Sequence, residues 1–159
     1  EYNLLINENN YDFFKNIIIF FFLFYSMFLV LIGHKYQCKF KDKLKDKLDR
    51  YFVGAVSIYI GTFVFGSNFD YRLIFLIFTI PYILNIQSNT LKYTLIICYI
   101  LSLNSFLIQH SSYFFISDVK SYIYYIKALI VYLSKFIIFT ILSYLLGSYL
   151  KKINFFSIK

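Results

Sequence analysis

Four polar side chains could carry chemistry in this sequence: Asn68, Asp70, Arg72 and Lys135. The first three lie in a short polar stretch, residues 67–72, between two apolar runs, and Lys135 lies inside a later apolar run. A guanidinium group can bind a phosphate through two parallel hydrogen bonds, and a carboxylate can act as a general base or orient a hydroxyl group. We therefore interpret Asp70 as the candidate catalytic residue and Arg72, Asn68 and Lys135 as candidate substrate-binding residues.

A structural interpretation of the same residues stays open. Asn68 or Ser67 can cap a helix that starts near Arg72, and Asp70 would then interact favourably with its N-terminus. Lys135 can extend its amino group toward the membrane surface, pair with Asp70, or bind an anionic phosphate head group. The residue types alone do not choose between these roles.

The composition indicates that these residues belong to a membrane protein. Of the 159 residues, 60% are hydrophobic and only 15% are charged, whereas about a quarter of the residues of a soluble domain are charged. Apolar runs separated by short polar breaks are typical of a chain that crosses a bilayer repeatedly. We predict an all-α, polytopic transmembrane helix bundle that forms one domain, residues 1–159. The expected spans are about five, at residues 16–33, 51–66, 73–86, 91–108 and 126–148.

The distribution of basic residues predicts the topology. The loop at residues 34–50 contains seven of the 16 Lys and Arg residues, and short loops rich in these residues stay in the cytoplasm. Alternating the spans from there places 11 of the 16 on the cytoplasmic side, with the N-terminus outside and the C-terminus inside. The same loop could instead form an amphipathic helix on the membrane surface, but a topological anchor explains its charge more simply.

Two short spans flank the polar stretch. Gly54 and Gly61 are seven residues apart and fall on nearly one helical face, so we predict that another helix packs closely there. Pro81 interrupts the third span and should kink it, because proline cannot donate a backbone hydrogen bond within a helix.

Several functions lack their usual motifs. His34 and His110 lie on opposite sides of the membrane in this topology. Cys38 lies in the basic loop and Cys98 lies inside an apolar run, so the two cysteines cannot form a disulfide framework. The sequence has no clustered metal ligands and no glycine-rich phosphate loop. We therefore expect no metal and no cofactor. Because the basic residues concentrate in one loop, we also expect no nucleic-acid partner.

Residues 51–85 resemble part of a bacterial family. The resemblance rests on Gly54-Ala55, on residues 58–63, and on residues 66–76 through Pro81. This stretch is similar to the C-terminal part of polytopic membrane proteins of cell-surface polysaccharide synthesis, some of which are likened to GT-C glycosyltransferases. The resemblance implies an assembly protein for polysaccharides or lipid-linked sugars. Its expected partners are the lipid bilayer, a polyprenyl-phosphate-linked sugar and other membrane subunits or upstream spans.

Two other functions remain open. The abundance of Phe, Ile, Tyr, Asn and Lys, with no Trp, is typical of a genome rich in A and T. This bias also fits a non-catalytic subunit of an organelle respiratory or ATP synthase complex, and the broken short spans also fit a transporter. We favour the bacterial inner membrane over the mitochondrial inner membrane. Because the chain begins at Glu1 without a Met, we expect that a leading piece was removed or that upstream spans are missing.

Overall fold

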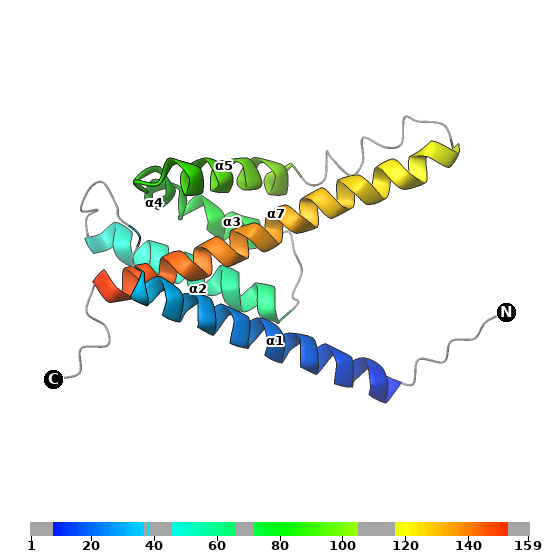
Figure 1. Cartoon of the computed structure of the whole chain (residues 1–159), viewed down its shortest axis with the longest axis horizontal. Coiled ribbons are helices and arrows are strands. Elements are labelled where there is room, and N and C mark those ends of the chain that lie inside the picture. The colour runs from blue at the N-terminus through cyan, green and yellow to red at the C-terminus, as the bar shows by residue number, and fades with distance from the viewer. Residues whose placement is uncertain (1–7, 37, 39–45, 66–71, 105–116, 153–159) are drawn as a thin grey trace.

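The chain is a bundle of helices of very different lengths (Figure 1). The computed structural model describes residues 8–36, 38, 46–65, 72–104 and 117–152. Within these ranges every regular element is a helix, which confirms the predicted all-α class. The helices are α1 (Glu8–Lys35), α2 (Asp46–Val64), α3 (Arg72–Ile77), α4 (Ile80–Leu84), α5 (Asn89–Leu103) and α7 (Ser117–Lys152).

Two helices are long and apolar enough to cross a membrane. They are Phe13–Lys35 within α1 and Tyr125–Lys151 within α7, with 23 and 27 residues. At about 1.5 Å per residue these segments measure about 35 and 40 Å, more than a hydrocarbon core of about 30 Å. The apolar helices Tyr51–Val64 and Asn89–Leu103 are shorter. Length and composition therefore support two of the five predicted spans directly.

The third predicted span is broken, as expected from Pro81. Residues 73–86 form α3 and α4, which are separated by a turn at Phe78 and Thr79. Pro81 lies in the first turn of α4, where its missing N–H costs no helical hydrogen bond. The Thr79 hydroxyl lies 2.7 Å from the Leu76 carbonyl oxygen and 2.6 Å from the Tyr99 hydroxyl. The Thr79 hydroxyl at the break therefore finds its hydrogen-bond partners within the protein.

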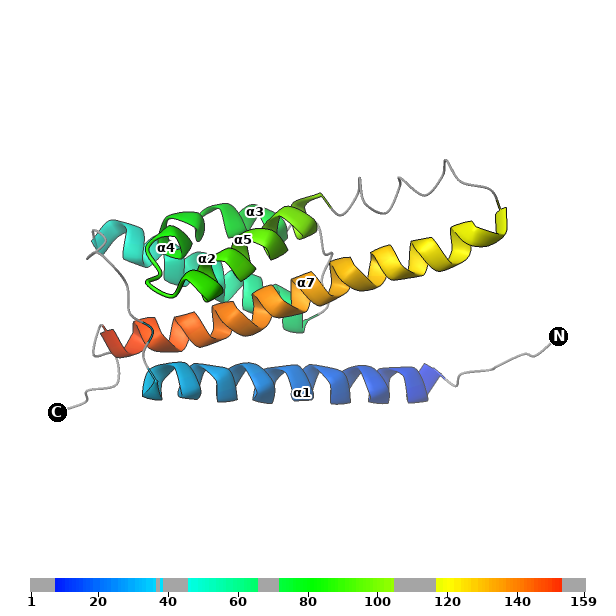
Figure 2. The same cartoon turned by 45° about the horizontal axis from the view of Figure 1, so that its top comes forward.

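Successive helices run in alternating directions along the bundle (Figure 1). The C-terminal ends of α1, α4 and α7 lie at the same end of the molecule as the N-terminal ends of α2 and α5. Figure 2, turned by 45°, shows the same alternation, with α1 and α7 side by side below the shorter helices. In this arrangement α3 and α4 together run once along the bundle. With α1, α2, α5 and α7, the described chain runs along the bundle five times; each such run is called a passage.

The longest helices, α1 and α7, are parallel and touch at two glycines near their C-terminal ends. A Cβ atom added to Gly33 would lie 2.0 Å from the Tyr144 carbonyl oxygen, and one added to Gly147 would lie 1.9 Å from that of Val30. The Ser148 hydroxyl, in turn, donates to the Gly33 carbonyl oxygen at 3.1 Å. Only glycine permits backbones to approach this closely.

The predicted close packing at Gly54 and Gly61 is wrong for this chain. A Cβ atom added to either residue would meet no atom within 4 Å. The opposite face of α2 carries the larger apolar side chains, such as Phe52 and Tyr59, and this face packs into the core. Burial of large side chains therefore decided the orientation of the helix, and Gly54 and Gly61 face open space.

Part of the basic loop belongs to the helix α2. The backbone of residues 46–50 forms the start of α2, so these residues do not belong to a separate surface helix. Residue 37 and residues 39–45 of the loop lie outside the described residues. Because α2 begins five residues before the predicted second span, the charged end of the loop continues directly into that helix.

Candidate functional site

Lys135 is the predicted site residue that the structure describes in full. It lies near the middle of α7, and only 6% of its surface is exposed. Its backbone carbonyl oxygen accepts a hydrogen bond from the Tyr59 hydroxyl at 3.3 Å. The next turn is fixed by Ile138 and Phe139, which are fully buried. The packing of α7 against α2 therefore fixes the backbone position of Lys135.

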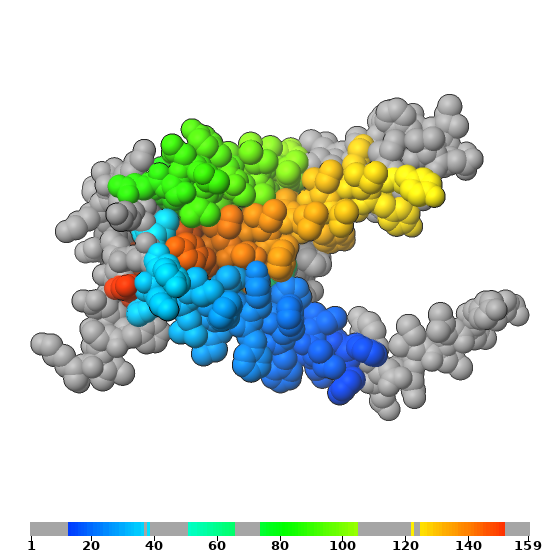
Figure 3. Space-filling model, viewed as in Figure 1, coloured from blue at the N-terminus to red at the C-terminus, as the bar shows by residue number. Residues whose placement is uncertain are grey.

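A cavity of about 450 Å³ opens beside Lys135 between α1, α2 and α7. Figure 3 shows the molecular surface at this side, where the N-terminal half of α1 diverges from α7. Most of the lining side chains are aromatic or aliphatic, and two are cationic. The lining residues are Phe14, Lys15, Ile18, Ile19, Phe22, Phe63, Val64, Phe65, Tyr132, Lys135 and Phe136.

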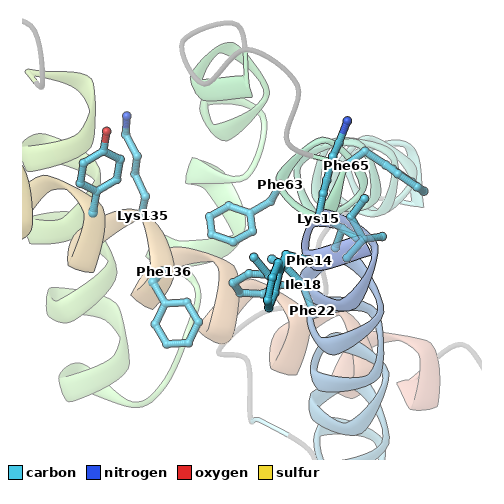
Figure 4. Close-up of a pocket in the computed structure, with 11 residues that line it drawn as sticks. Phe14, Lys15, Ile18, Phe22, Phe63, Phe65, Lys135 and Phe136 are labelled. Atoms are coloured by element: carbon cyan, nitrogen blue, oxygen red, sulfur yellow. The ribbon is translucent and has the colours of Figure 1, made fainter. Parts of the chain in front are cut away.

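The two cations come from different helices (Figure 4). Lys15 is exposed on α1, whereas Lys135 is buried on α7. In the close-up both amino groups point to the same side of the cavity, above the rings of Phe22, Phe63 and Phe136. Among the described residues that line the cavity, none is acidic. The cavity therefore combines an apolar wall with positive charge, which suits an amphiphilic anion.

The side chains of the remaining predicted site residues lie outside the described part of the chain. Phe65, which lines the cavity, is the last described residue before the polar stretch. Asn68 and Asp70 lie outside the described residues. The backbone of Arg72 begins α3, as the expected helix start required, while its side chain is outside the described part.

Sequence reasoning missed Lys15 as a site residue. This lysine directly precedes the first apolar run and has the pattern of an ordinary interface lysine. Its position opposite Lys135 depends on the parallel contact of α1 with α7, which joins residues more than 100 positions apart. Local spacing contains no signal for such a pairing.

A second cavity, of about 600 Å³, lies toward the other end of the bundle between α1 and α2. Its polar side chains are Ser26, His34 and Ser57, and its other lining residues are mainly aliphatic. Among the described residues no group of three or more His, Cys, Asp or Glu side chains could hold a metal. Cys38 and Cys98, which are the two cysteines of the chain, do not form a disulfide.

The broken passage does not line either of these two cavities. All their lining residues come from α1, α2, α7 and the residue that follows α2. A transporter site at discontinuous helices would use the unwound backbone to bind its substrate. Here the break at Thr79 is buried in the core against Tyr99, so the break has a structural explanation.

The fold and the cavity define an all-helical chain with two potential membrane helices and a cationic, aromatic-walled cavity. No protein-family model, no curated protein and no solved structure matches the chain.

Proposed function

We propose that the chain is a five-span membrane protein that takes part in the assembly of lipid-linked sugars or cell-surface polysaccharide. The observation that carries the proposal is Lys135, a cation buried near the middle of an apolar helix and facing a cavity. In this function the cavity holds the anionic part of a lipid-linked substrate. The polar stretch that includes Asp70 and Arg72 supplies the remaining polar groups.

The parallel arrangement of α1 and α7 supports more than two spans. A chain reverses its direction at every crossing, so two parallel crossings must have an odd number of crossings between them. The described helices offer three such passages, namely α2, α3 with α4, and α5 (Figure 1). The short helices fit a bundle in which the bilayer thins locally or their ends extend to the interface.

The charges at the helix ends support the orientation. Lys35, Lys92 and Lys151 all lie at the end of the bundle where α1 and α7 finish. The positive-inside rule assigns this end to the cytoplasm, together with the basic loop. The cavity with Lys135 then lies toward the external side, in the part of the bundle where α2 ends.

Burial of Lys135 favours a functional role over an incidental one. It lies ten residues from Tyr125, or about 15 Å along the apolar segment. A lysine at the centre of a membrane helix costs about 3 kcal/mol on insertion scales, and such residues usually mark a functional site. In this function the phosphate of the substrate would place a negative charge beside the ammonium group.

The roles of the other residues follow from their chemistry and from the family resemblance. Arg72 would bind a phosphate in a bidentate manner, and Asn68 would hold a neighbouring oxygen atom by hydrogen bonding. Asp70 would act as a base or orient the hydroxyl group that reacts. Lys135 would contribute charge from the side of α7, so the substrate would lie between the polar stretch and the cavity.

The proposal is tested by replacing Arg72. Arg72→Ala should abolish glycan assembly in the source cell while the amount of protein in the membrane stays unchanged. Arg72→Lys should fail as well, because an ammonium group cannot supply the planar, two-pronged contact. Arg50→Ala is a matched control, since it removes the only other arginine, which precedes the second apolar segment. Normal amounts of surface glycan in the Arg72→Ala strain would overturn the proposed function.

A further inference from the structure

We propose that the end of the bundle where α1 and α7 finish binds the head groups of anionic phospholipids at two positions (Figure 1). The α1–α7 position is formed by Lys35, Tyr36 and Lys151, and the α5 position by Lys92 and Tyr93. The inference goes beyond the proposed function, because it concerns the lipids around the chain and not a substrate. It shares with that function only the placement of the helices across a bilayer.

Two helix ends meet at the α1–α7 position. The Lys151 amino group donates to the Lys35 carbonyl oxygen at 3.4 Å, and the Tyr144 hydroxyl donates to that of Tyr36 at 3.0 Å. The amino group of Lys35 lies over the Tyr36 ring, 5.3 Å from its centroid. An ammonium group has three N–H donors, and the printed contact of Lys151 uses one of them. Two cationic side chains therefore start from the same junction of α1 and α7.

The α5 position repeats the pair of lysine and tyrosine on another helix. The Lys92 amino group lies 5.5 Å from the centroid of the exposed Tyr93 ring. Cations near the C-terminal ends of helices interact favourably with the helix dipole, which accounts for Lys35 and Lys151. Lys92 is instead the fourth residue of α5, where the dipole opposes a cation, and the first turn contains no acidic residue. Stabilisation of its own helix therefore does not explain this lysine, whereas an external anion would.

An exposed apolar ridge leads from each position toward the middle of the bundle. Its members recur every three or four residues, so they lie on one face of the helix, and each is more than half exposed. They are Ile97 and Ile100 after Tyr93 on α5, and Leu31, Phe28 and Phe24 before Lys35 on α1. The ridge on α1 covers 11 residues, or about 17 Å, which is close to half of a hydrocarbon core of about 30 Å. Each ridge therefore offers apolar contact to the acyl chain of a lipid whose phosphate lies beside the lysine.

This combination favours an anionic phospholipid over other partners. A nucleic acid or an acidic protein would use the cations but would leave the apolar ridges without a role. A zwitterionic lipid fits the ridges but has no net charge to balance the lysines. Tyrosine rings also favour the interface between membrane and water, which is where the head groups lie. A lysine near the surface of an anionic leaflet contributes about a fivefold preference for that leaflet.

Quenching by brominated lipids tests the inference in the full chain. The sequence has no Trp, so Tyr36→Trp and Tyr93→Trp each place one reporter at one position and keep an aromatic ring beside the lysine. Each variant is reconstituted into symmetric bilayers of phosphatidylglycerol and phosphatidylcholine, in which one lipid or the other is brominated. The ratio of the two quenching curves gives the relative affinity for the two lipids at the reporter. Symmetric bilayers make this ratio independent of which end faces the cytoplasm.

We expect phosphatidylglycerol to be preferred about fivefold at the Tyr93→Trp reporter, where one lysine acts, and more strongly at the Tyr36→Trp reporter. Phe14→Trp is the control reporter, because it is exposed at the opposite end of α1; it should show nearly equal affinities. The preference at both positions should fall in concentrated salt, where the Debye length decreases to about 3 Å at 1 M.

The lysines are then replaced in the reporter variants. Lys92→Gln should abolish the preference at the Tyr93→Trp reporter, and Lys35→Gln should lower it about fivefold at the Tyr36→Trp reporter. Lys35→Gln retains the backbone carbonyl oxygen that Lys151 contacts, so it tests the position even if Lys151→Gln does not assemble. Lys15→Gln is the matched control, because it removes the same charge from an exposed residue near the other end of α1. It should leave both preferences unchanged.

The outcomes separate this inference from the proposed function. Equal affinity for the two lipids at either reporter would overturn the position on which it reports, and so would a preference that survives the loss of the lysines there. A similar preference at the Phe14→Trp reporter would show attraction by the whole charged chain and would overturn both positions. Arg72 belongs to neither position. Lysine-dependent lipid preference in a chain whose Arg72→Ala variant still assembles glycan would support the inference and refute the function, and loss of glycan assembly without lipid preference would do the reverse.

Discussion

The contact between α1 and α7 makes a prediction that can be worked out from the structure. Gly147→Ala would place a methyl group 1.9 Å from the Val30 carbonyl oxygen, whereas ordinary contacts begin near 3.4 Å. The neighbouring atoms are backbone and cannot rotate away. The two helices must therefore separate by about 1.5 Å, the difference between these two distances.

The separation has an estimable cost. Hydrogen bonds span the contact, among them one from Ser148 to the Gly33 carbonyl oxygen at 3.1 Å and one from Tyr144 to that of Tyr36 at 3.0 Å. Each is worth about 0.6 kcal/mol in a membrane, and overpacking of a close contact costs about 1–3 kcal/mol. Alanine regains about 1 kcal/mol in helix propensity. The net loss of stability for Gly147→Ala is therefore about 1–3 kcal/mol.

The assay is reversible unfolding of the full chain from mild micelles by increasing SDS, followed by near-ultraviolet circular dichroism of its 17 tyrosines. Gly61→Ala is the control, because an added Cβ there meets no atom within 4 Å, so it should be neutral or stabilising by up to about 1 kcal/mol. Gly33→Ala added to Gly147→Ala should cost less than it does alone, since the helices have already separated. Equal stability of Gly147→Ala and Gly61→Ala would refute the reasoning.

Three further predictions test the topology, the core and the loop. An impermeant maleimide should label the Lys15→Cys variant in intact cells, but the Lys92→Cys variant only after permeabilisation, in each case above the labelling of the parent chain. The reverse pattern would contradict the orientation. Thr79→Val should cost about 1–3 kcal/mol in the unfolding assay, because it removes a 2.6 Å hydrogen bond from the buried Tyr99 hydroxyl; adding Tyr99→Phe should not increase the loss. Burial raises the pKa of the Cys38 thiol, so the stability gained by burying the neutral thiol is lost as the pH rises through that pKa. At pH 8, iodoacetamide should react more slowly with Cys38 in the folded chain than in the unfolded chain. Equal rates would contradict the burial.

The sequence predicts the helical segments well where the physical cause is local. The runs that become the central parts of α1 and α7 contain no proline and few charges, so their helices are visible as long apolar stretches. The break between α3 and α4 is equally local, because Pro81 cannot continue a helical hydrogen-bond pattern. In each case the residues that decide the structure lie within one or two turns of each other.

Helix pairing could not be predicted in the same way. Gly33 and Gly147 are single glycines in two unrelated apolar runs, whereas Gly54 and Gly61 present a repeated small face. The repeated face appears the better packing surface when each helix is considered alone. The chain instead buries the large side chains of α2, including Phe52 and Tyr59, and leaves Gly54 and Gly61 without a closely packed neighbour within 4 Å of an added Cβ atom. The competition between faces is decided by the whole bundle.

The same pairing explains how a buried lysine comes to face a cavity. At Gly33 and Gly147 the backbones of α1 and α7 touch, but further toward their N-terminal ends the rings of Phe22 and Phe136 stand between them. Bulky side chains require a larger separation of the helix axes than glycines do, so the two helices must diverge in this direction (Figure 1). Lys135 lies 12 residues, or about 18 Å, before Gly147, within the diverging part. A tight glycine crossing at one end and aromatic spacers along the bundle therefore create the room in which Lys135 is placed.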